Sequence, residues 1–271
     1  MKLESRHWIF LGLGAAVVAA MALQVNLQVP ASDDTLGMHR FIEEVPAGST
    51  IIVSFDHEAS SLPEIRPLAL AVLRHAFSRN LKIVGTALLA EGTGVGYRLV
   101  QQTAREYDKR YGEDWVYLGF KPQYIAAILS MGESFAKTWP EDYLGRPYTD
   151  LPMLAEIETY GQIAGVVSVA DGSLTTHWIE YAASRYRVRV AAAVTAAMVT
   201  TYDPYLASGQ LQAMVGGLRG AAEYEQLIAR GGGGERGMLA QTVSHLYVVA
   251  LIVVGNLVFF ATRRREKGGG G

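Results

Sequence analysis

Two uncharged apolar segments lie at opposite ends of this chain of 271 residues. The first, Trp8 to Val25, reads WIFLGLGAAVVAAMALQV, and the second, Leu246 to Thr262, reads LYVVALIVVGNLVFFAT. A helix that crosses a hydrocarbon core of roughly 30 Å needs about 20 such residues. We therefore predict an N-terminal and a C-terminal transmembrane helix, both in contact with the lipid bilayer.

Basic residues flank both segments on the sides that face the chain termini: Lys2, Arg6, Arg263, Arg264, Arg265 and Lys267. Basic flanks stay on the cytoplasmic side of a membrane. We therefore expect a protein of the cell membrane with both termini cytoplasmic and the main domain extracytoplasmic.

The first apolar segment has a second interpretation, as a signal peptide. Ala20, Met21 and Ala22 form an A-x-A-like cleavage site after an apolar run of suitable length. The domain is exported under either interpretation. The absence of cysteine is compatible with export, although it does not require it.

The charge of the chain is divided unevenly between its ends and its middle. The net charge of the chain is -2. With Glu4 included, the N-terminal flank carries +1, and with Glu266 included, the C-terminal flank carries +3. The region between the two apolar segments therefore carries -6. Nucleic-acid binding requires a basic surface. The charge distribution therefore excludes nucleic acid as the expected partner.

The composition divides the chain into consecutive segments. Residues 28–48 contain proline, aspartate and glycine and are expected to be a connector, with a short helix near 38–45. The glycine-rich stretch after Ala229 is expected to be a flexible linker. The predicted segments are 1–27 (N-terminus and first membrane helix), 28–48 (connector), 49–230 (α/β domain), 231–244 (linker), 245–262 (second membrane helix) and 263–271 (basic cytoplasmic tail).

Strand-like and helix-like patterns alternate through the middle region. Short apolar, β-branched runs indicate strands at 49–55, 81–89, 115–120, 165–170 and 188–195. Helical periodicity indicates helices at 62–79, 96–111, 124–139, 174–186 and 205–229. Alternation of this kind predicts an α/β fold with a doubly wound, mainly parallel sheet of five strands, of the Rossmann or flavodoxin type.

In a doubly wound sheet, ligands bind beyond the carboxyl ends of the strands. Asp56, His57 and Glu58 follow the first predicted strand, and Asp171 and Ser173 follow the fourth. Carboxylates suit a cation such as Mg²⁺, which activates water for hydrolysis. The alternative is that Asp56 caps the next helix, that His57 and Glu58 lie in solvent, and that Ser173 belongs to a helix-capping turn.

A glycine-rich turn follows the second predicted strand and contains Gly92, Thr93, Gly94 and Gly96. A turn at this place can hold a phosphate at a helix N-terminus, which makes these residues candidate ligand contacts. The spacing is G-x-G-x-G rather than the dinucleotide fingerprint, and tight packing of the helix explains the glycines equally well. The histidines show no metal-ligand spacing. We predict neither a metal site nor a cofactor.

Two further segments are candidate interfaces. The stretch 139–152 is rich in proline and aromatic residues, with Trp139, Tyr143 and Tyr148 as the contact candidates.

A second candidate consists of small residues: Gly216, Gly217, Gly220 and Ala221. Their spacing gives a helix face that another backbone can approach closely, either the domain's own sheet or a second subunit. We therefore expect a homo-oligomer or an association with other membrane subunits.

Several sequence blocks carry a resemblance: VSFDHE, REYDKRYGEDWVYLGFKP, YDPYL and GGLRGAAEYE. With these blocks, residues 48 to 228 resemble a family of bacterial membrane-anchored proteins for which no activity, substrate or catalytic residue is established. The resemblance implies a single anchored domain and nothing about mechanism.

The sequence favours a non-enzymatic protein whose exported domain is a binding or assembly module, alone or as a subunit of a larger membrane complex. The alternative is a membrane-anchored metal-dependent hydrolase with its site at the carboxyl edge of the sheet.

Overall fold

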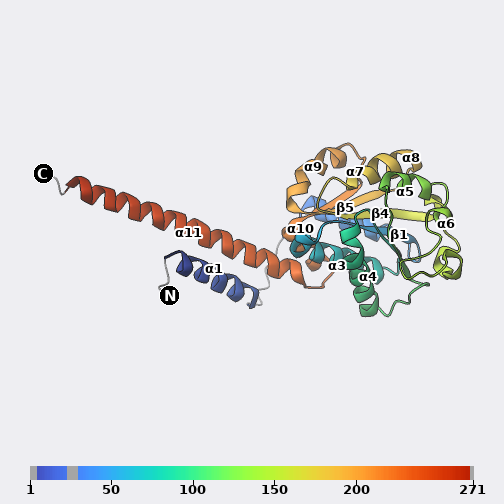
Figure 1. Ribbon diagram of the computed structural model, residues 1–271, viewed down its shortest axis with the longest axis horizontal. Coiled ribbons are helices and arrows are strands. Elements are labelled where there is room, and N and C mark those ends of the chain that lie inside the picture. The colour runs from blue at the N-terminus through green and yellow to red at the C-terminus, as the bar shows by residue number, and fades with distance from the viewer. Residues whose placement is uncertain (1–4, 23–29, 269–271) are drawn as a thin grey trace. The chain divides into compact units, whose positions relative to one another are not determined.

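A computed structural model describes residues 5–22 and 30–268 of the chain (Figure 1). These residues belong to two compact units, an α/β domain of residues 28–234 and a helical unit of residues 1–27 and 235–271. Three parts of the predicted segments lie outside the described residues: 1–4, 23–29 and 269–271. The first of these includes the basic Lys2.

The centre of the domain is a six-stranded sheet in which every neighbouring pair of strands is parallel. The strand order is β3-β2-β1-β4-β5-β6, the doubly wound order of the Rossmann fold. The strands are β1 (Thr50–Asp56), β2 (Lys82–Ala87), β3 (Trp115–Phe120), β4 (Ile163–Ala170), β5 (Val190–Val194) and β6 (Ala213–Gly216). The predicted α/β class with a parallel sheet is confirmed, whereas the predicted number of five strands is wrong.

The sixth strand lies within the segment predicted as one helix, 205–229. The chain instead forms α9 (Ala196–Ala207), turns at Gly209 with φ +73°, adds β6 to the edge of the sheet, and enters α10 (Gly217–Leu227). Ala213, Met214 and Val215 are buried. Periodicity alone does not separate a short apolar strand from a piece of buried helix. Pairing with β5 decides the outcome.

Helices cover both faces of the sheet (Figure 1). On one face lie α2 (Asp33–Glu43), α3 (Leu62–Ser78), α4 (Ala90–Glu106) and α10. On the other face lie α5 (Tyr124–Met131), α6 (Phe135–Thr138), α9 and a continuous helical stretch made of α7 (Thr175–His177), the π-helical η5 (Trp178–Ala183) and α8 (Ser184–Tyr186). Short 3₁₀ turns occupy Ala59–Ser61, Tyr148–Asp150, Pro152–Leu154 and Tyr160–Gln162.

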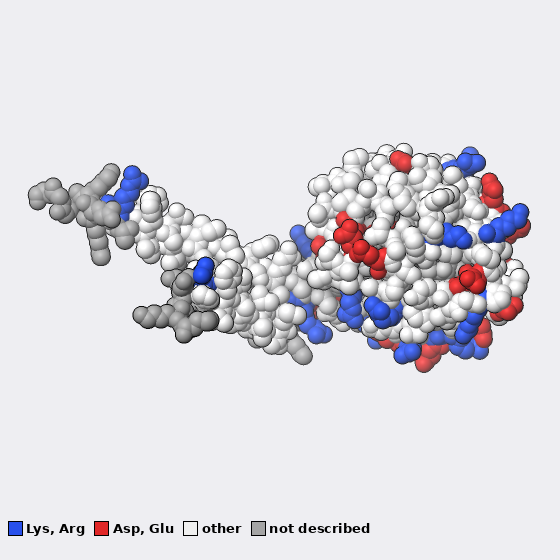
Figure 2. Space-filling view, in the orientation of Figure 1, with Lys and Arg blue, Asp and Glu red and all other residues white. Residues whose placement is uncertain are grey.

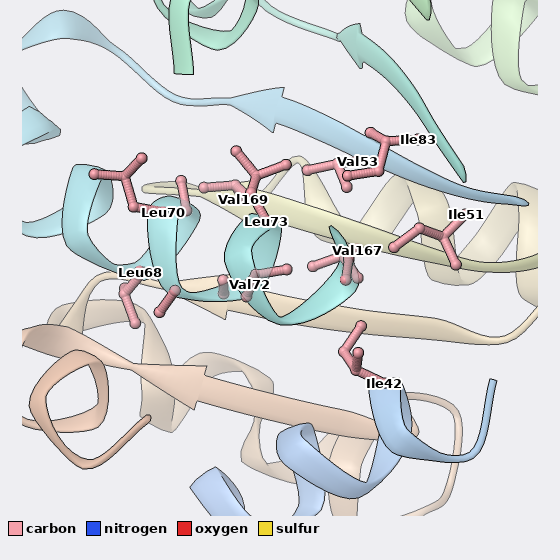
Figure 3. Packing of buried hydrophobic residues seen from close by; sticks show 14 of the residues in the cluster. Ile42, Ile51, Val53, Leu68, Leu70, Val72, Leu73, Ile83, Val167 and Val169 are labelled. Carbon is pink, nitrogen blue, oxygen red and sulfur yellow. The ribbon is translucent and has the colours of Figure 1, made fainter. Parts of the chain in front are cut away.

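An apolar core lies between the sheet and α3 (Figure 3). Successive side chains of a strand point to opposite faces. Ile51 and Val53 of β1 therefore lie on the face that α3 covers, in one apolar cluster with Val167 and Val169 of β4 and Leu73 of α3. The intervening β1 positions, Ile52, Ser54 and Asp56, project toward the other face of the sheet. Ser54 and Asp56 are buried polar residues there.

Helix α2 makes the segment expected to be a connector part of the folded domain. Met38 and Ile42 are fully buried. The buried carboxylate of Glu223 in α10 accepts hydrogen bonds from the Ser32 backbone N–H (2.9 Å) and the Thr35 hydroxyl (2.8 Å). The domain therefore begins before the predicted boundary at residue 49.

Three other predicted elements differ from the structure. Helix α4 begins at Ala90 rather than 96, and the predicted helix 124–139 is interrupted between α5 and α6, where the side chain of Ser134 caps α6 by accepting from the Lys137 N–H. The predicted linker 231–244 is mostly helical, because α11 (Gly233–Gly268) begins inside it. The Gly234 N–H donates to the carboxylate of Glu225 at 3.1 Å, which satisfies one of the free amides of a helix start.

The second unit contains α1 (Ser5–Ala22) and most of α11. In the described part of the chain, one helix is long and apolar enough to cross a membrane, at Gly233–Ala261, while the apolar part of α1, Arg6–Ala22, is shorter. The Tyr247 hydroxyl donates to the Ile9 carbonyl at 3.1 Å, and its ring lies against Gly12. Figure 2 shows few charged residues on these helices and both signs of charge over the domain.

Candidate functional site

The strand order reverses between β1 and β4, so the chain leaves these neighbours in opposite directions and opens the sheet at their carboxyl ends. Asp56 ends β1, and Asp171 directly follows β4. The structure therefore brings the two predicted groups of candidate residues to one edge. Their side chains nevertheless have different surroundings.

Asp56 is fully buried and is surrounded by hydrogen-bond donors. Its Oδ1 accepts from the Ser54 hydroxyl (2.6 Å) and the Leu88 N–H (2.8 Å). Its Oδ2 accepts from the Ser168 hydroxyl (2.8 Å) and the indole Nε1 of Trp178 (3.0 Å). Each oxygen thus has both of its in-plane acceptor positions occupied. This arrangement holds the ends of β1, β2 and β4 together and leaves no carboxylate oxygen for a metal ion.

Burial raises the pKa of Asp56 above its ordinary value. Removal from water disfavours the charged form of a carboxyl group, while the surrounding donors favour it and oppose the shift. The net direction is upward. Asp56 is buried and therefore differs from the solvated capping residue of the alternative interpretation.

A row of polar side chains supports Asp56 from beneath. Ser54 is in register with Thr86 on β2 and with Ser168 on β4, and all three are buried. The Ser168 hydroxyl also contacts the Thr175 hydroxyl at 2.9 Å. The sequence interpretation missed this row. Its signal was a serine between apolar residues in each of two strands, VSF and VSVA.

Two backbone N–H groups just beyond Asp56 donate to carboxylates from other parts of the domain. The Glu58 N–H donates to the Asp171 carboxylate (2.8 Å), and the Ala59 N–H donates to the Glu91 carboxylate (3.3 Å). Free amides at this position are what a Rossmann fold offers to a phosphate. Here carboxylates occupy them and would also repel an anion. The arrangement therefore argues against a bound dinucleotide.

His57 is buried beside these loops. Its Nδ1 lies 3.0 Å from the Glu58 carbonyl, and its Nε2 has no hydrogen-bond partner among the described residues. Ser173 is exposed, and its carbonyl accepts from the Thr176 N–H at 3.1 Å. His177 contacts the rings of Tyr124 and Tyr181. Ser173 thus belongs to a turn that starts a helix.

The predicted glycine turn lies inside the first turns of α4 rather than before them. A Cβ on Gly92 would meet the backbone of Phe55 and lie 3.3 Å from the His57 carbonyl oxygen, and one on Gly96 would lie 2.5 Å from the Phe55 ring and the Tyr117 hydroxyl. A Cβ on Gly94 would meet only the Arg98 side chain, at 3.9 Å. Two of the three glycines therefore allow α4 to pack closely on β1.

A cavity of about 340 Å³ opens at the carboxyl end of β3. We call it the β3-end cavity and define it by its lining residues: Thr93, Leu118, Gly119, Phe120, Lys121, Trp139, Pro140, Glu141, Asp142 and Tyr143. Thr93 was a predicted ligand contact, and Trp139 and Tyr143 were predicted interface residues. The structure brings these three residues, from two distant parts of the chain, around one space.

Hydrogen bonds to Asp142 hold one wall of this cavity in place. Its carboxylate accepts from the Tyr111 hydroxyl (2.6 Å) and from the backbone N–H groups of Leu144 (2.8 Å) and Arg146 (2.9 Å). Tyr143 packs against the rings of Tyr97 and Tyr117 at centroid distances of 5.2 and 5.6 Å. The cavity wall is therefore preformed.

Three side chains of the lining have features that bear on a ligand. Trp139 is only 4% exposed, and its indole Nε1 has no hydrogen-bond partner in the described part of the chain. A buried donor without a partner costs about 1–3 kcal/mol. The Lys121 ammonium lies 5.3 Å from the centre of the Trp139 ring, and Tyr143 is 45% exposed. Lys121 was not among the predicted site residues.

The remaining predicted interface residues are engaged within the domain. Tyr148 is buried and donates to the Ile157 carbonyl at 2.6 Å. Gly216 packs against Val199, and Gly217 has φ +69° and lies against Ala196. Gly220 faces Val215, and Ala221 is fully buried next to Gly234. The close approach predicted for these small residues occurs between elements of one domain.

Comparison of the chain with known proteins yields no match, whether to a family model, to a curated protein or to a solved structure.

Proposed function

We propose that this chain is a membrane-anchored binding protein whose extracytoplasmic α/β domain takes a small ligand in the β3-end cavity. The observation that carries the proposal is the convergence of Thr93, Trp139 and Tyr143 on this cavity, together with the unpartnered indole donor and the nearby ammonium of Lys121. Nothing in the proposal requires a reaction.

The lining defines the chemistry of the ligand. Ligand sites commonly measure about 300–1,000 Å³, so a cavity of about 340 Å³ suits a small molecule. Lys121 favours a negative charge, and the indole donor of Trp139 requires a hydrogen-bond acceptor. Tyr143 and the partly exposed Phe120 favour a flat apolar part. These features together describe a small aromatic carboxylate or a molecule of the same kind.

Assembly, the other role that the sequence predicts, is less favoured. Gly217, Gly220 and Ala221 pack against their own domain, so they do not require a second subunit. Association through the bilayer segments stays a prediction.

The hydrolase alternative loses its central residue, because the oxygens of Asp56 are occupied. A metal at this edge would have to rely on Glu58, Glu91 and Asp171. The binding role therefore accounts for more of the observations.

The proposal can be tested by ¹⁹F NMR on the full-length protein in detergent. The chain has 4 tryptophans, and labelling them with 5-fluorotryptophan gives resonances that single Trp→Phe variants assign. We expect aromatic carboxylate fragments to shift the resonance of Trp139. Trp178 is an internal control, because it is fully buried and its Nε1 already donates to Asp56.

A pair of lysine variants makes the test specific. Lys121→Met should weaken fragment binding about fivefold, since a charge pair at about 4 Å contributes roughly 1 kcal/mol in water-like surroundings. Lys137→Met removes a lysine of α6 that does not line the cavity and should leave affinity unchanged. Equal affinities of the two variants, or a Trp139 resonance that no fragment shifts, would contradict the proposal.

A further inference from the structure

A second group of side chains lies away from the β3-end cavity, between α2 and α3. His39 and Glu43 are four residues apart and therefore share one side of α2. His75 comes from α3 and is almost fully buried. One ligand atom from each of the three residues lies within 4.8 Å of the other two.

The contacts among these side chains already resemble a coordination shell. His75 Nε2 lies 2.9 Å from Glu43 Oε1, and the rings of His39 and His75 stack with centroids 4.4 Å apart. Without an ion, the Nε2–H of His75 donates to the carboxylate. An ion bound to Nε2 and to the carboxylate oxygen requires the other neutral tautomer of His75, in which the ring proton has moved from Nε2 to Nδ1 and no net proton is released.

The other nitrogen of His75 has its own partner. Nδ1 lies 2.8 Å from the hydroxyl of the buried Tyr224 in α10. Metal-binding histidines almost always engage their second ring nitrogen in a hydrogen bond of this kind, which fixes the ring orientation. Burial also lowers the pKa of His75, which favours the neutral ring that a metal requires.

We propose that His39, Glu43 and His75 form a Zn²⁺-binding site that ties α2 to α3. Two imidazole nitrogens and one carboxylate oxygen are a ligand set that zinc accepts, with water in the fourth position. In a tetrahedral site with bonds of about 2.0–2.1 Å, ligand atoms lie roughly 3.3 Å apart. Glu43 is 40% exposed and His39 is partly exposed, so their side chains have room to close this difference.

Arg79 sets a limit on the affinity of this site. Its Nε lies 3.3 Å from Glu43 Oε2, so the guanidinium contacts the oxygen that is not needed for the ion. The positive charge nevertheless opposes cation binding. Zn²⁺ and its transition-metal neighbours are therefore expected to bind, whereas Mg²⁺ and Ca²⁺, which prefer sites composed of oxygen ligands, are not.

The test is a Zn²⁺ titration of the full-length protein in detergent, after removal of any histidine tag and of bound metal with a chelator. We expect one ion per chain by calorimetry and a visible absorption spectrum typical of tetrahedral coordination when Co²⁺ replaces Zn²⁺. His39→Ala and Glu43→Gln should each weaken Zn²⁺ binding at least tenfold and alter the Co²⁺ spectrum. His177→Ala, which removes a histidine outside the cluster, should change neither.

Because His39 and Glu43 are partly exposed, their variants test the site without removing a core side chain, as His75→Ala would. Circular dichroism of each variant shows that it has folded. Two results would overturn the proposal: a wild-type chain that binds no Zn²⁺, or equal affinities of wild type and His39→Ala. Neither result would bear on the ligand proposed for the β3-end cavity.

Discussion

At the scale of single residues, Asp56 shows how surroundings change the role of a side chain. A carboxylate at the end of the first strand is a reasonable candidate for a functional site from sequence. In the folded domain, Ser54, Ser168 and Trp178 occupy its oxygens together with the Leu88 N–H. Two of these donors lie more than 100 positions away in the chain, at separations of 112 and 122. The sequence around Asp56 therefore does not show that they reach it.

The raised pKa of Asp56 gives a prediction about pH. The pKa of Asp56 in the folded state lies above its ordinary value of 3.8. As pH rises, this carboxyl group therefore ionises in the unfolded chain before it ionises in the folded one. The stability that protonated Asp56 contributes is present below that value and is lost as pH rises through the folded pKa. Asp56→Asn should destabilise the domain by about 1–3 kcal/mol at about pH 4, because the amide brings two N–H donors where the protonated acid brings one O–H, which a neighbouring serine hydroxyl can accept. The difference should shrink toward about pH 8.

Urea unfolding followed by tryptophan fluorescence measures this difference at each pH. Other carboxyl groups titrate in both proteins and cancel in the comparison. A destabilisation that is constant or grows as pH rises would mean that the four donors outweigh burial and that Asp56 is ionised throughout.

At the scale of elements, the approach of α4 to β1 depends on particular glycines. Gly92 packs against the backbone at the end of β1, which cannot move without disturbing the sheet, whereas Gly94 on the same helix meets only Arg98 at 3.9 Å. Both sites are otherwise ordinary helix positions. They form a natural pair for comparing steric demand with helix propensity.

Gly92→Ala should therefore lower the unfolding free energy by about 1–3 kcal/mol, the usual range for overpacking. Gly94→Ala should raise it by up to about 1 kcal/mol, because alanine is the better helix former. Thermal or urea unfolding of the two variants gives the comparison. Similar effects of the same sign would show that α4 does not approach β1 as closely as described.

The β6 strand is the clearest error of element prediction, and its cause is physical. Residues 205–229 contain apolar residues at spacings that fit a helix, and the short strand inside this range has no alternation that would distinguish it. The open edge of β5 provides backbone partners for it, and Gly209 and Gly217, both at positive φ, allow the chain to enter and leave the strand. Only the assembled sheet supplies that edge.

At the scale of the whole molecule, the proposed orientation places the α/β domain outside the membrane and the C-terminus inside. The chain contains no cysteine, so a single introduced cysteine can be labelled without background. Thr149→Cys lies at an exposed position of the domain. We expect a membrane-impermeant maleimide to label it in intact cells, and a cysteine appended after Gly271 to react only after the cells are permeabilised.

The reverse labelling pattern would overturn the orientation. Labelling of the C-terminal cysteine in intact cells would also remove the argument from the basic residues beyond the second apolar segment. A cysteine added before Trp8 distinguishes the two interpretations of the N-terminal segment, because cleavage after Ala22 would remove it from the mature protein.

The sequence by itself determined the features that depend on neighbouring residues. The alternation of apolar strands and amphipathic helices predicted a parallel α/β domain, and the uncharged C-terminal run predicted a helix long enough to span a membrane. These patterns are readable because the periodicity of a helix or strand is repeated within a few residues.

Tertiary structure alone decided the strand order, the enclosed state of Asp56, the β3-end cavity and the cluster of His39, Glu43 and His75. Each of these depends on groups that are distant in sequence, as when His75 meets Tyr224 149 positions later. A sequence pattern records what a residue is next to in the chain. The packing of α2, α3 and α10, and the reversal between β1 and β4, determine what it is next to in space.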